Sequence, residues 1–185
     1  MTKNFTLSRT NTALLVIDVQ EKLFPLVERS DEILYKLRQA VQGFQILGLP
    51  IYVTEQYPQG LGEVVPDLKC SLGPTQVYFS KTTFSCLADE KIKGVLVSQP
   101  VNQWVVSGIE AHVCVLQTVK ELLKTGHEVV VLNDAISSRS IYDYSTAIAE
   151  MRDYGARISS TETVLFELVH DSKAPEFKQI SQLIK

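Results

Sequence analysis

Residues 104–119, WVVSGIEAHVCVLQTV, are the stretch that decides the fold. The stretch opens with an aromatic residue and two valines, residue types that favour a buried strand, and the Ser107-Gly108 pair is expected to end that strand. From Ala111 onward the apolar residues recur at helical spacing. A strand followed directly by a helix predicts one unit of an alternating α/β sheet.

Cys114 lies in the first turn of this predicted helix. At that position free backbone N–H groups and the positive end of the helix dipole favour a thiolate. We therefore expect the pKa of Cys114 to lie below the value of about 8.5 that a free thiol has. A free cysteine is more often a small buried hydrophobic residue than a nucleophile, so its function depends on which side chains lie beside it.

The sequence on both sides repeats the alternation of apolar runs and amphipathic segments. The run ALLVID at residues 13–18 is typical of a strand buried on both faces of a parallel sheet. This alternation predicts an α/β protein with three α/β/α layers, a doubly wound, mainly parallel six-stranded sheet, and a single domain over residues 1–185. The predicted strands are residues 13–18, 50–54, 77–80, 102–107, 127–132 and 157–160, and the predicted helices are residues 31–47, 88–98, 111–125, 141–153, 163–170 and 175–184.

Residues 55–73 show no clean hydrophobic period and contain several prolines and glycines. We expect a long loop here. Loops of this length are uncommon in compact domains and are usually functional. The segment at residues 55–61 is therefore expected to shape a substrate pocket.

The composition limits the partners that this chain could bind. The formal net charge is −3 and the isoelectric point is near 5.6, which argues against nucleic acid as a main partner. No apolar run approaches the roughly 20 residues that a membrane span needs, so no membrane partner is expected. The three cysteines are odd in number and widely spaced, which predicts free thiols and a cytoplasmic location.

Two further ionisable residues lie at or directly after the carboxyl end of a predicted strand. Cys114 has a similar position, because its predicted helix follows a strand. Asp18 ends the first strand and Lys81 follows the third. Active sites of doubly wound sheets lie at the carboxyl ends of the strands, so these three residues are expected at one edge. A carboxylate, a lysine and a cysteine are what a thiol hydrolase needs for proton removal, charge stabilisation and attack. The plainer interpretations are a turn residue for Asp18 and a solvated surface lysine for Lys81.

Three motifs carry a resemblance to a known family. VIDVQ, FSKTTFS and VSGIEAHVCV resemble the isochorismatase-like cysteine hydrolases, which include nicotinamidases and N-carbamoyl amidases, and the match spans nearly the whole chain in order. The resemblance implies a catalytic triad of Asp18, Lys81 and Cys114 that cleaves a small amide-like substrate. It also implies a cis peptide bond joining Ile109 to Glu110, whose N–H would face the oxyanion together with that of Cys114. Family members tend to be homo-oligomers, so a dimer or a tetramer is expected.

The sequence departs from the nicotinamidase pattern where those enzymes bind zinc. They use an Asp-x-His pair after the second strand and one further histidine, whereas residues 54–57 here read TEQY and contain no histidine. We therefore expect no metal and no cofactor. The TEQYPQGLG stretch resembles isochorismatase-domain proteins of unassigned substrate. Residues expected to line the pocket are Gln20, Phe24, Glu55, Tyr57, Phe84, His112 and Tyr142.

Two other classes remain open. The fold could serve as a catalytically idle binding or assembly module, in which case Cys114 would be inert. A second α/β family places its cysteine on a strand-to-helix elbow, as glutamine amidotransferase-like proteins do. That family requires small residues around the cysteine, and His112, Val113 and Val115 fit this requirement poorly.

Overall fold

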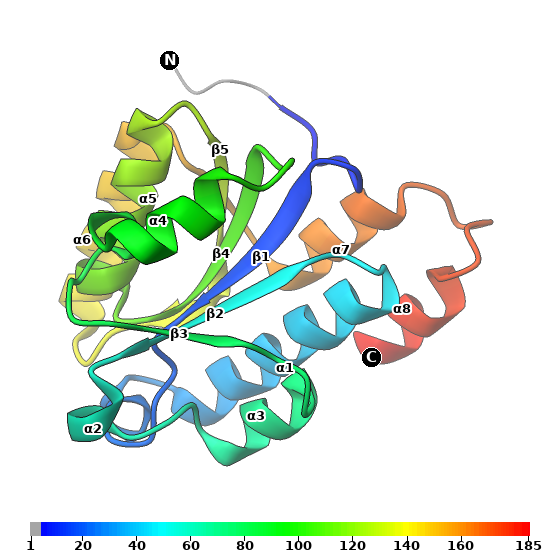
Figure 1. The fold of residues 1–185 in the computed structure, drawn as a ribbon. Helices are drawn as coiled ribbons and strands as arrows, with labels where there is room; N and C mark the ends of the chain where they lie inside the picture. The colour runs from blue at the N-terminus through cyan, green and yellow to red at the C-terminus, as the bar shows by residue number, and fades with distance from the viewer. Residues whose placement is uncertain (1–4) are drawn as a thin grey trace.

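A computed structural model describes residues 5–185 (Figure 1). Six parallel strands form one sheet in the order β3-β2-β1-β4-β5-β6. The predicted α/β fold with a doubly wound six-stranded sheet is therefore confirmed. The strands are β1 (Thr12–Ile17), β2 (Ile51–Gln56), β3 (Tyr78–Lys81), β4 (Gln103–Ile109), β5 (Glu128–Ser137) and β6 (Arg157–Ser159).

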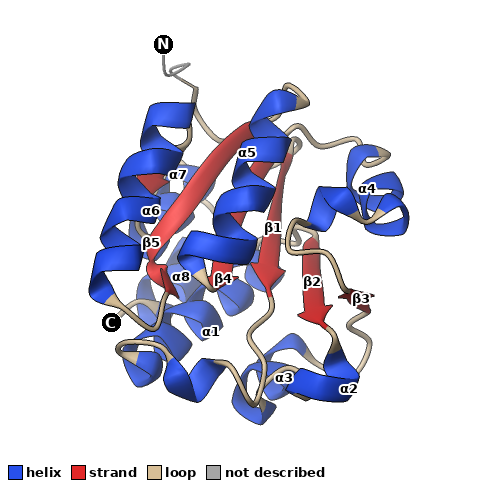
Figure 2. Ribbon diagram, turned by 90° about the vertical axis from the view of Figure 1, so that its left-hand side faces the viewer, coloured by secondary structure: helices blue, strands red, loops and turns tan. Residues whose placement is uncertain are grey.

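The strand order contains one reversal point, between β1 and β4. The chain runs outward through β2 and β3 on one side of β1, and then through β4, β5 and β6 on the other. Figure 2 shows the arrowheads of β1 and β2 pointing toward the same edge of the sheet. In open α/β sheets the crevice for a ligand lies at such a point, beyond the carboxyl ends of the strands.

Helices cover both faces of the sheet, as Figure 1 shows. Because adjacent strand residues point to opposite faces, Leu14 and Val16 of β1 pack in one core and Leu15 and Ile17 in the other. The first core lies under α1 (Ser30–Ile46), α3 (Pro66–Leu72), α7 (Thr161–Val169) and α8 (Phe177–Leu183). The second lies under α4 (Glu90–Val97), α5 (Leu116–Lys124) and α6 (Ile141–Tyr154). Short 3₁₀ helices cover Phe24–Leu26 and Cys86–Ala88.

The predicted long loop at residues 55–73 is wrong. Strand β2 continues to Gln56, and two short helices follow, α2 (Pro58–Leu61) and α3 (Pro66–Leu72). Each helix begins with a proline, whose fixed φ suits the first helical position. Helices of four and seven residues are too short to produce a readable amphipathic period, which is why the pattern predicted a loop.

The predicted strand end at Ser107-Gly108 is also wrong, because β4 continues through both residues to Ile109. Gly108 has a φ of +117°, and a Cβ atom there would lie 2.1 Å from the carbonyl oxygen of Ile17. A glycine therefore lets β4 approach β1 closely, at a register shift with β5. The predicted helix is divided into a π-helix, Ala111–Val115, and α5.

Other element boundaries differ from the predicted ones by a few residues. Within residues 5–185, no helix combines the length and the apolar character that crossing a membrane requires.

Candidate active site

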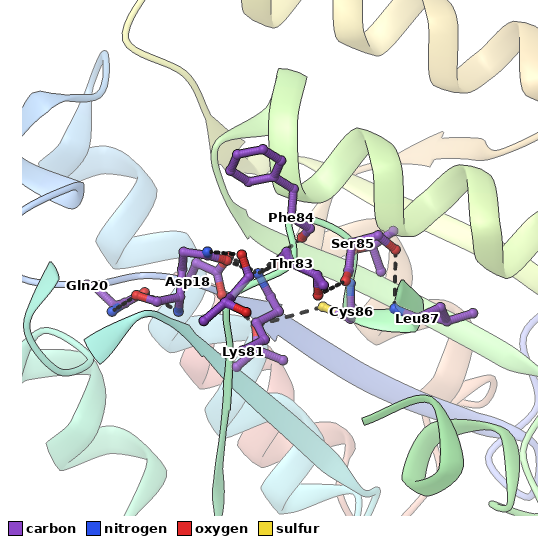
Figure 3. Close-up of polar contacts among 12 residues, drawn as sticks. Asp18, Gln20, Lys81, Thr83, Phe84, Ser85, Cys86 and Leu87 are labelled. Carbon is purple, nitrogen blue, oxygen red and sulfur yellow. Dashed lines mark hydrogen bonds and ion pairs between the residues drawn. The ribbon is translucent and has the colours of Figure 1, made fainter. Parts of the chain in front are cut away.

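Asp18 and Lys81 form a buried ion pair at the carboxyl edge of the sheet. Asp18 follows β1 and Lys81 ends β3. Lys81 Nζ lies 2.6 Å from Asp18 Oδ2, and both side chains are completely buried. Figure 3 shows the pair with the segment from Thr83 to Cys86 gathered beside it. Lys81 is therefore not a solvated surface lysine.

Asp18 is held by its backbone as well as by its carboxylate. Its φ is +53°, in the left-handed region that residues other than glycine seldom adopt. The Asp18 N–H donates to the carbonyl oxygen of Thr54 at 3.1 Å, and the Thr54 hydroxyl donates to Asp18 Oδ1 at 2.7 Å. The two carboxylate oxygens thus have different partners, a hydroxyl and an ammonium.

The Lys81 ammonium faces three further acceptors. Gln56 Oε1 lies at 2.8 Å, and the carbonyl oxygens of Thr83 and Phe84 lie at 3.2 and 3.1 Å. Burial lowers the pKa of Lys81 and is the largest single effect, but the Asp18 carboxylate and the two nearby cysteine sulfurs together raise it more, so that the pKa lies above its ordinary value. Lys81 is therefore a cation at neutral pH.

Cys114 lies in the π-helix and is 6% exposed. Burial raises the pKa of its thiol, the Asp18 carboxylate raises it further, and Lys81 acts in the opposite direction without outweighing them. The expectation of a lowered pKa is therefore wrong. The expectation relied on an exposed helix start, whereas the N–H groups of Val113 and Val115 already donate to the Glu110 carbonyl oxygen, at 3.1 and 3.2 Å.

A second buried thiol, Cys86, lies beside the ion pair. It follows the loop after Lys81, and its Sγ atom lies 3.9 Å from the Thr54 hydroxyl (Figure 3). Its N–H donates to the Thr118 hydroxyl at 3.0 Å. Burial raises the pKa of Cys86 to about 11, so the thiol stays protonated at neutral pH. The sequence pattern did not single out this residue, because a cysteine in a loop without a periodic neighbourhood carries no signal of burial.

The peptide bond between Ile109 and Glu110 is cis, at the position that the resemblance implies. The Glu110 carboxylate accepts from Arg139 Nε at 2.8 Å. His112 Nδ1 lies 3.0 Å from the Ser138 hydroxyl. The segments that carry residues 110–112 and 138–139 are therefore joined by side-chain contacts at the end of β4 and β5.

The residues expected to line a pocket fall into two groups. Gln20, Phe24 and Glu55 are buried, and Phe24 packs in the core under α1. Tyr57, Phe84, His112 and Tyr142 are the more exposed group, with Tyr142 reaching 81%. In Figure 3 the Phe84 ring points away from the ion pair.

A cavity of about 210 Å³ lies beside Lys81, lined by Tyr57, Pro58, Gln59, Ser80, Lys81, Thr82 and Asp89. A larger cavity of about 560 Å³ lies between the start of α1 and the later part of β5, and its lining includes none of Asp18, Lys81 and Cys114. The cavity nearest the ion pair is therefore the smaller of the two, and it opens on the side of α2.

Residues 12–163 match the Isochorismatase domain. The chain belongs to the isochorismatase family. Isochorismatase domain-containing protein 1 of Danio rerio is 37% identical over 180 residues, which cover 97% of this chain and 62% of that relative. The chain thus spans less than two thirds of that relative's length.

Two solved structures extend the comparison to the fold. One from Caenorhabditis elegans, named as the MAR1 ribonuclease, is 40% identical with a TM-score of 0.91 and covers 97% of this chain and 92% of its own. The YcaC gene product of Escherichia coli, described as an octameric hydrolase of unknown specificity, is 22% identical with a TM-score of 0.91, over 99% and 91% of the two chains. At that identity the likeness extends to the fold alone. The chain therefore has the fold of isochorismatase-family hydrolases.

The side chains at the end of β2 and directly after it do not fit the zinc arm of the family's nicotinamidases. The Glu55 carboxylate is buried and accepts the Val64 N–H at 2.8 Å, while the Gln56 amide is bound to Lys81. Tyr57 is more than half exposed. Among residues 5–185, no three His, Cys, Asp or Glu side chains are grouped so as to hold a metal ion. The polar atoms of Glu55 and Gln56 are therefore used in hydrogen bonds within the protein.

Proposed function

We propose that this isochorismatase-family chain is a cysteine hydrolase that cleaves a small amide or carbamoyl-type C–N bond. In this proposal Cys114 forms a thioester, Asp18 is the base and Lys81 stabilises charge. The observation that carries the proposal is the completely buried Asp18–Lys81 ion pair, 2.6 Å long, which acts on the pKa of Cys114. A buried ion pair that shifts the pKa of an adjacent nucleophile is typical of an active site.

The first half of the reaction forms the thioester. Because burial raises the pKa of Cys114, the resting group is a thiol, and its proton passes to Asp18 as sulfur attacks the carbonyl carbon. The N–H groups of Glu110 and Cys114 receive the developing oxyanion. The C–N bond then breaks, and the leaving amine takes the proton from Asp18.

The second half clears the thioester. Asp18, now a carboxylate again, removes a proton from a water molecule that attacks the acyl carbon. The C–S bond breaks, sulfur takes the proton back, and the acid product leaves. Lys81 keeps its proton throughout, since its raised pKa lies far from neutral pH, and it holds the carboxylate in place.

The surroundings of the site support a small substrate. Only a narrow part of Cys114 is exposed, so the substrate must present a slender acyl group. We place Tyr57, Phe84, His112 and Tyr142 at the rim, where their exposure leaves them able to contact a substrate or a second copy of the chain. A homo-oligomer is supported by the YcaC gene product, which is described as an octamer; the dimer or tetramer stays a prediction from the sequence. A cytoplasmic location is supported by the free state of all three cysteines.

Ribonuclease activity is the second candidate function, because the C. elegans structure is named as a ribonuclease. RNA is bound mainly through lysine and arginine contacts to phosphate. This chain carries a net charge of −3, and Lys81 is committed to a buried ion pair. These observations favour the amide hydrolase, and RNA belongs in the test as the competing substrate.

The test is a panel of small amides, carbamoyl compounds, esters and RNA, assayed with the wild-type chain and with Cys114→Ala. We expect one amide-like class to be hydrolysed, an acyl adduct on Cys114 in the mass spectrum with slow substrates, and loss of turnover in Cys114→Ala. The matched control is Cys70→Ala, because Cys70 is an exposed free thiol outside the site.

Three results would contradict the proposal. Cys114→Ser could retain most of the activity, or no adduct could form on Cys114. RNA could be hydrolysed equally by Cys114→Ala and wild type, which would favour the ribonuclease. A properly folded chain with an inert Cys114 and no turnover on the panel would favour the idle module.

A further inference from the structure

The end of β2 contacts both charged side chains of the candidate site, Asp18 and Lys81. Because successive strand residues point to opposite faces, Thr54 and Gln56 share one face while Glu55 points to the other. Thr54 contacts Asp18, and Gln56 contacts Lys81. One strand therefore holds the carboxylate and the ammonium through two residues whose separation is set by the strand itself.

Thr54 fixes the carboxylate at two points. Its hydroxyl donates to Asp18 Oδ1 at 2.7 Å, and its carbonyl oxygen accepts the Asp18 N–H at 3.1 Å. Thr54 is completely buried and pairs with Ile17 across the β1–β2 ladder. With Oδ2 on Lys81, the carboxylate cannot rotate without breaking a charge-assisted hydrogen bond.

Gln56 fixes the ammonium in a similar way. Its Nε2 donates to the Thr82 carbonyl oxygen at 2.8 Å, so its Oε1 must face Lys81. The Gln56 backbone is clamped in turn by the Gln20 side chain, which accepts the Gln56 N–H at 2.7 Å and donates to the Gln56 carbonyl oxygen at 2.9 Å. The amide is thus oriented before any substrate arrives.

We propose that Thr54 and Gln56 are positioning residues, which hold the Asp18 carboxylate and the Lys81 ammonium in the one arrangement that lets Asp18 accept the Cys114 proton. This role rests on the proposed function of the site. Neither residue touches the reacting atoms; each acts through its ion. Removal of the Thr54 hydroxyl leaves Asp18 Oδ1 without this partner, so the carboxylate can turn out of the position from which it accepts the Cys114 proton.

The test measures alkylation of Cys114 by iodoacetamide against pH, followed peptide by peptide in the mass spectrometer, because the exposed Cys70 also reacts. We expect Thr54→Val to slow alkylation at neutral pH by about tenfold or more, the effect of a lost charge-assisted hydrogen bond to the group that accepts the thiol proton. Thr54→Ser keeps the hydroxyl and should restore the wild-type profile. Gln56→Met should slow alkylation as well.

The matched control is Thr161→Val. Thr161 is equally buried, and its hydroxyl donates to a carboxylate, Asp134 Oδ1, at 3.0 Å, far along the chain from the site. This variant removes the same kind of hydrogen bond and should leave the alkylation profile unchanged. Circular dichroism and thermal melts establish that each variant is folded. If Thr54→Val does not fold, Thr54→Ser and Gln56→Met still decide between positioning and plain stability.

The outcomes separate this inference from the proposed function. At neutral pH burial keeps Cys114 a thiol even in Asp18→Asn, which loses both a charge that raises the Cys114 pKa and the group that would accept its proton. If wild-type Cys114 reacts no faster there than in Asp18→Asn, the proposed function fails, and the positioning role fails with it. If Asp18→Asn slows alkylation but the Thr54→Val and Gln56→Met profiles match wild type and Thr161→Val, the positioning role alone is overturned. Failure of Thr54→Ser to restore the profile would likewise contradict it.

Discussion

At the scale of single residues, Asp18, Lys81 and Cys114 form one electrostatic unit. The Asp18 carboxylate raises the pKa of Lys81 and also that of Cys114, because an anion favours both protonated forms. The unit therefore rests as a carboxylate, an ammonium and a thiol. In the proposed reaction a buried thiol needs a base within reach, and Asp18 is the carboxylate beside Cys114.

Cys86 makes stability depend on pH. Burial raises the pKa of its thiol to about 11, whereas an unfolded chain ionises a thiol near 8.5. The contribution of Cys86 is therefore complete below about pH 8.5 and is lost as the pH rises toward its folded value. We expect the free energy of unfolding in urea to fall between about pH 8 and 11, and to fall less steeply in Cys86→Ala. Cys70→Ala, at an exposed thiol, should leave the slope unchanged. Equal slopes for wild type and Cys86→Ala would contradict this prediction.

At the scale of elements, the close approach of β4 to β1 brings the chain segments of Asp18 and Cys114 together. Gly108 pairs with Ile17 in the parallel β1–β4 ladder, and Ile17 is the residue directly before Asp18. The space for a side chain there is occupied by the Ile17 backbone, which cannot move without moving Asp18. The strand that leads to Cys114 and the strand that leads to Asp18 thus meet at a glycine.

Gly108→Ala should be strongly destabilising. The new Cβ atom would meet the Ile17 carbonyl oxygen at 2.1 Å, and φ is +117°, which a residue with a Cβ rarely adopts. We expect a loss of about 3 kcal/mol or more in the free energy of unfolding, measured by urea denaturation. Gly94→Ala is the control, because Gly94 lies in α4 and a Cβ atom there would meet no other part of the chain within 4 Å, so alanine should gain up to about 1 kcal/mol. A Gly108→Ala chain as stable as wild type would contradict the close approach.

At the scale of the whole molecule, strand order decides which side chains can meet. Asp18 and Cys114 follow adjacent strands, but Lys81 ends β3, two strands away from β1. Neighbouring strands lie about 4.8 Å apart, so the Lys81 and Asp18 side chains together must span roughly 10 Å across β2 to meet. A long side chain is needed for this reach, and the β2 residues beneath it, Thr54 and Gln56, are the ones that contact the two ions.

The distribution of side chains that could bind a metal predicts that the reactivity of Cys114 does not depend on zinc. His112, His127 and His170 lie on three separate segments, and Glu55 is engaged with backbone. We expect less than one equivalent of zinc in the purified protein by elemental analysis, and an unchanged alkylation rate at Cys114 after chelation. Adding zinc back after chelation is the control. One tightly held metal ion per chain would overturn the prediction.

The sequence by itself determined the fold class and the edge of the sheet that carries the site. Apolar runs such as residues 13–18 are long, and their burial on both faces depends on residue type alone, so the strands and their alternation with helices were predictable. Asp18 and Lys81 end such runs, and parallel strands bring their carboxyl ends to one edge. Helices α2 and α3 were not predictable, because their few residues carry no period.

Only the tertiary structure decided the chemistry of the site, because it depends on contacts between residues far apart in the chain. Cys114 is a thiol rather than a thiolate because distant segments bury it and place Asp18 beside it. Strand β4 continues through Gly108 because β1 lies against it. Thr54 and Gln56 carry no catalytic signature in the sequence. They contact Asp18 and Lys81 because β2 lies between β1 and β3 in the sheet.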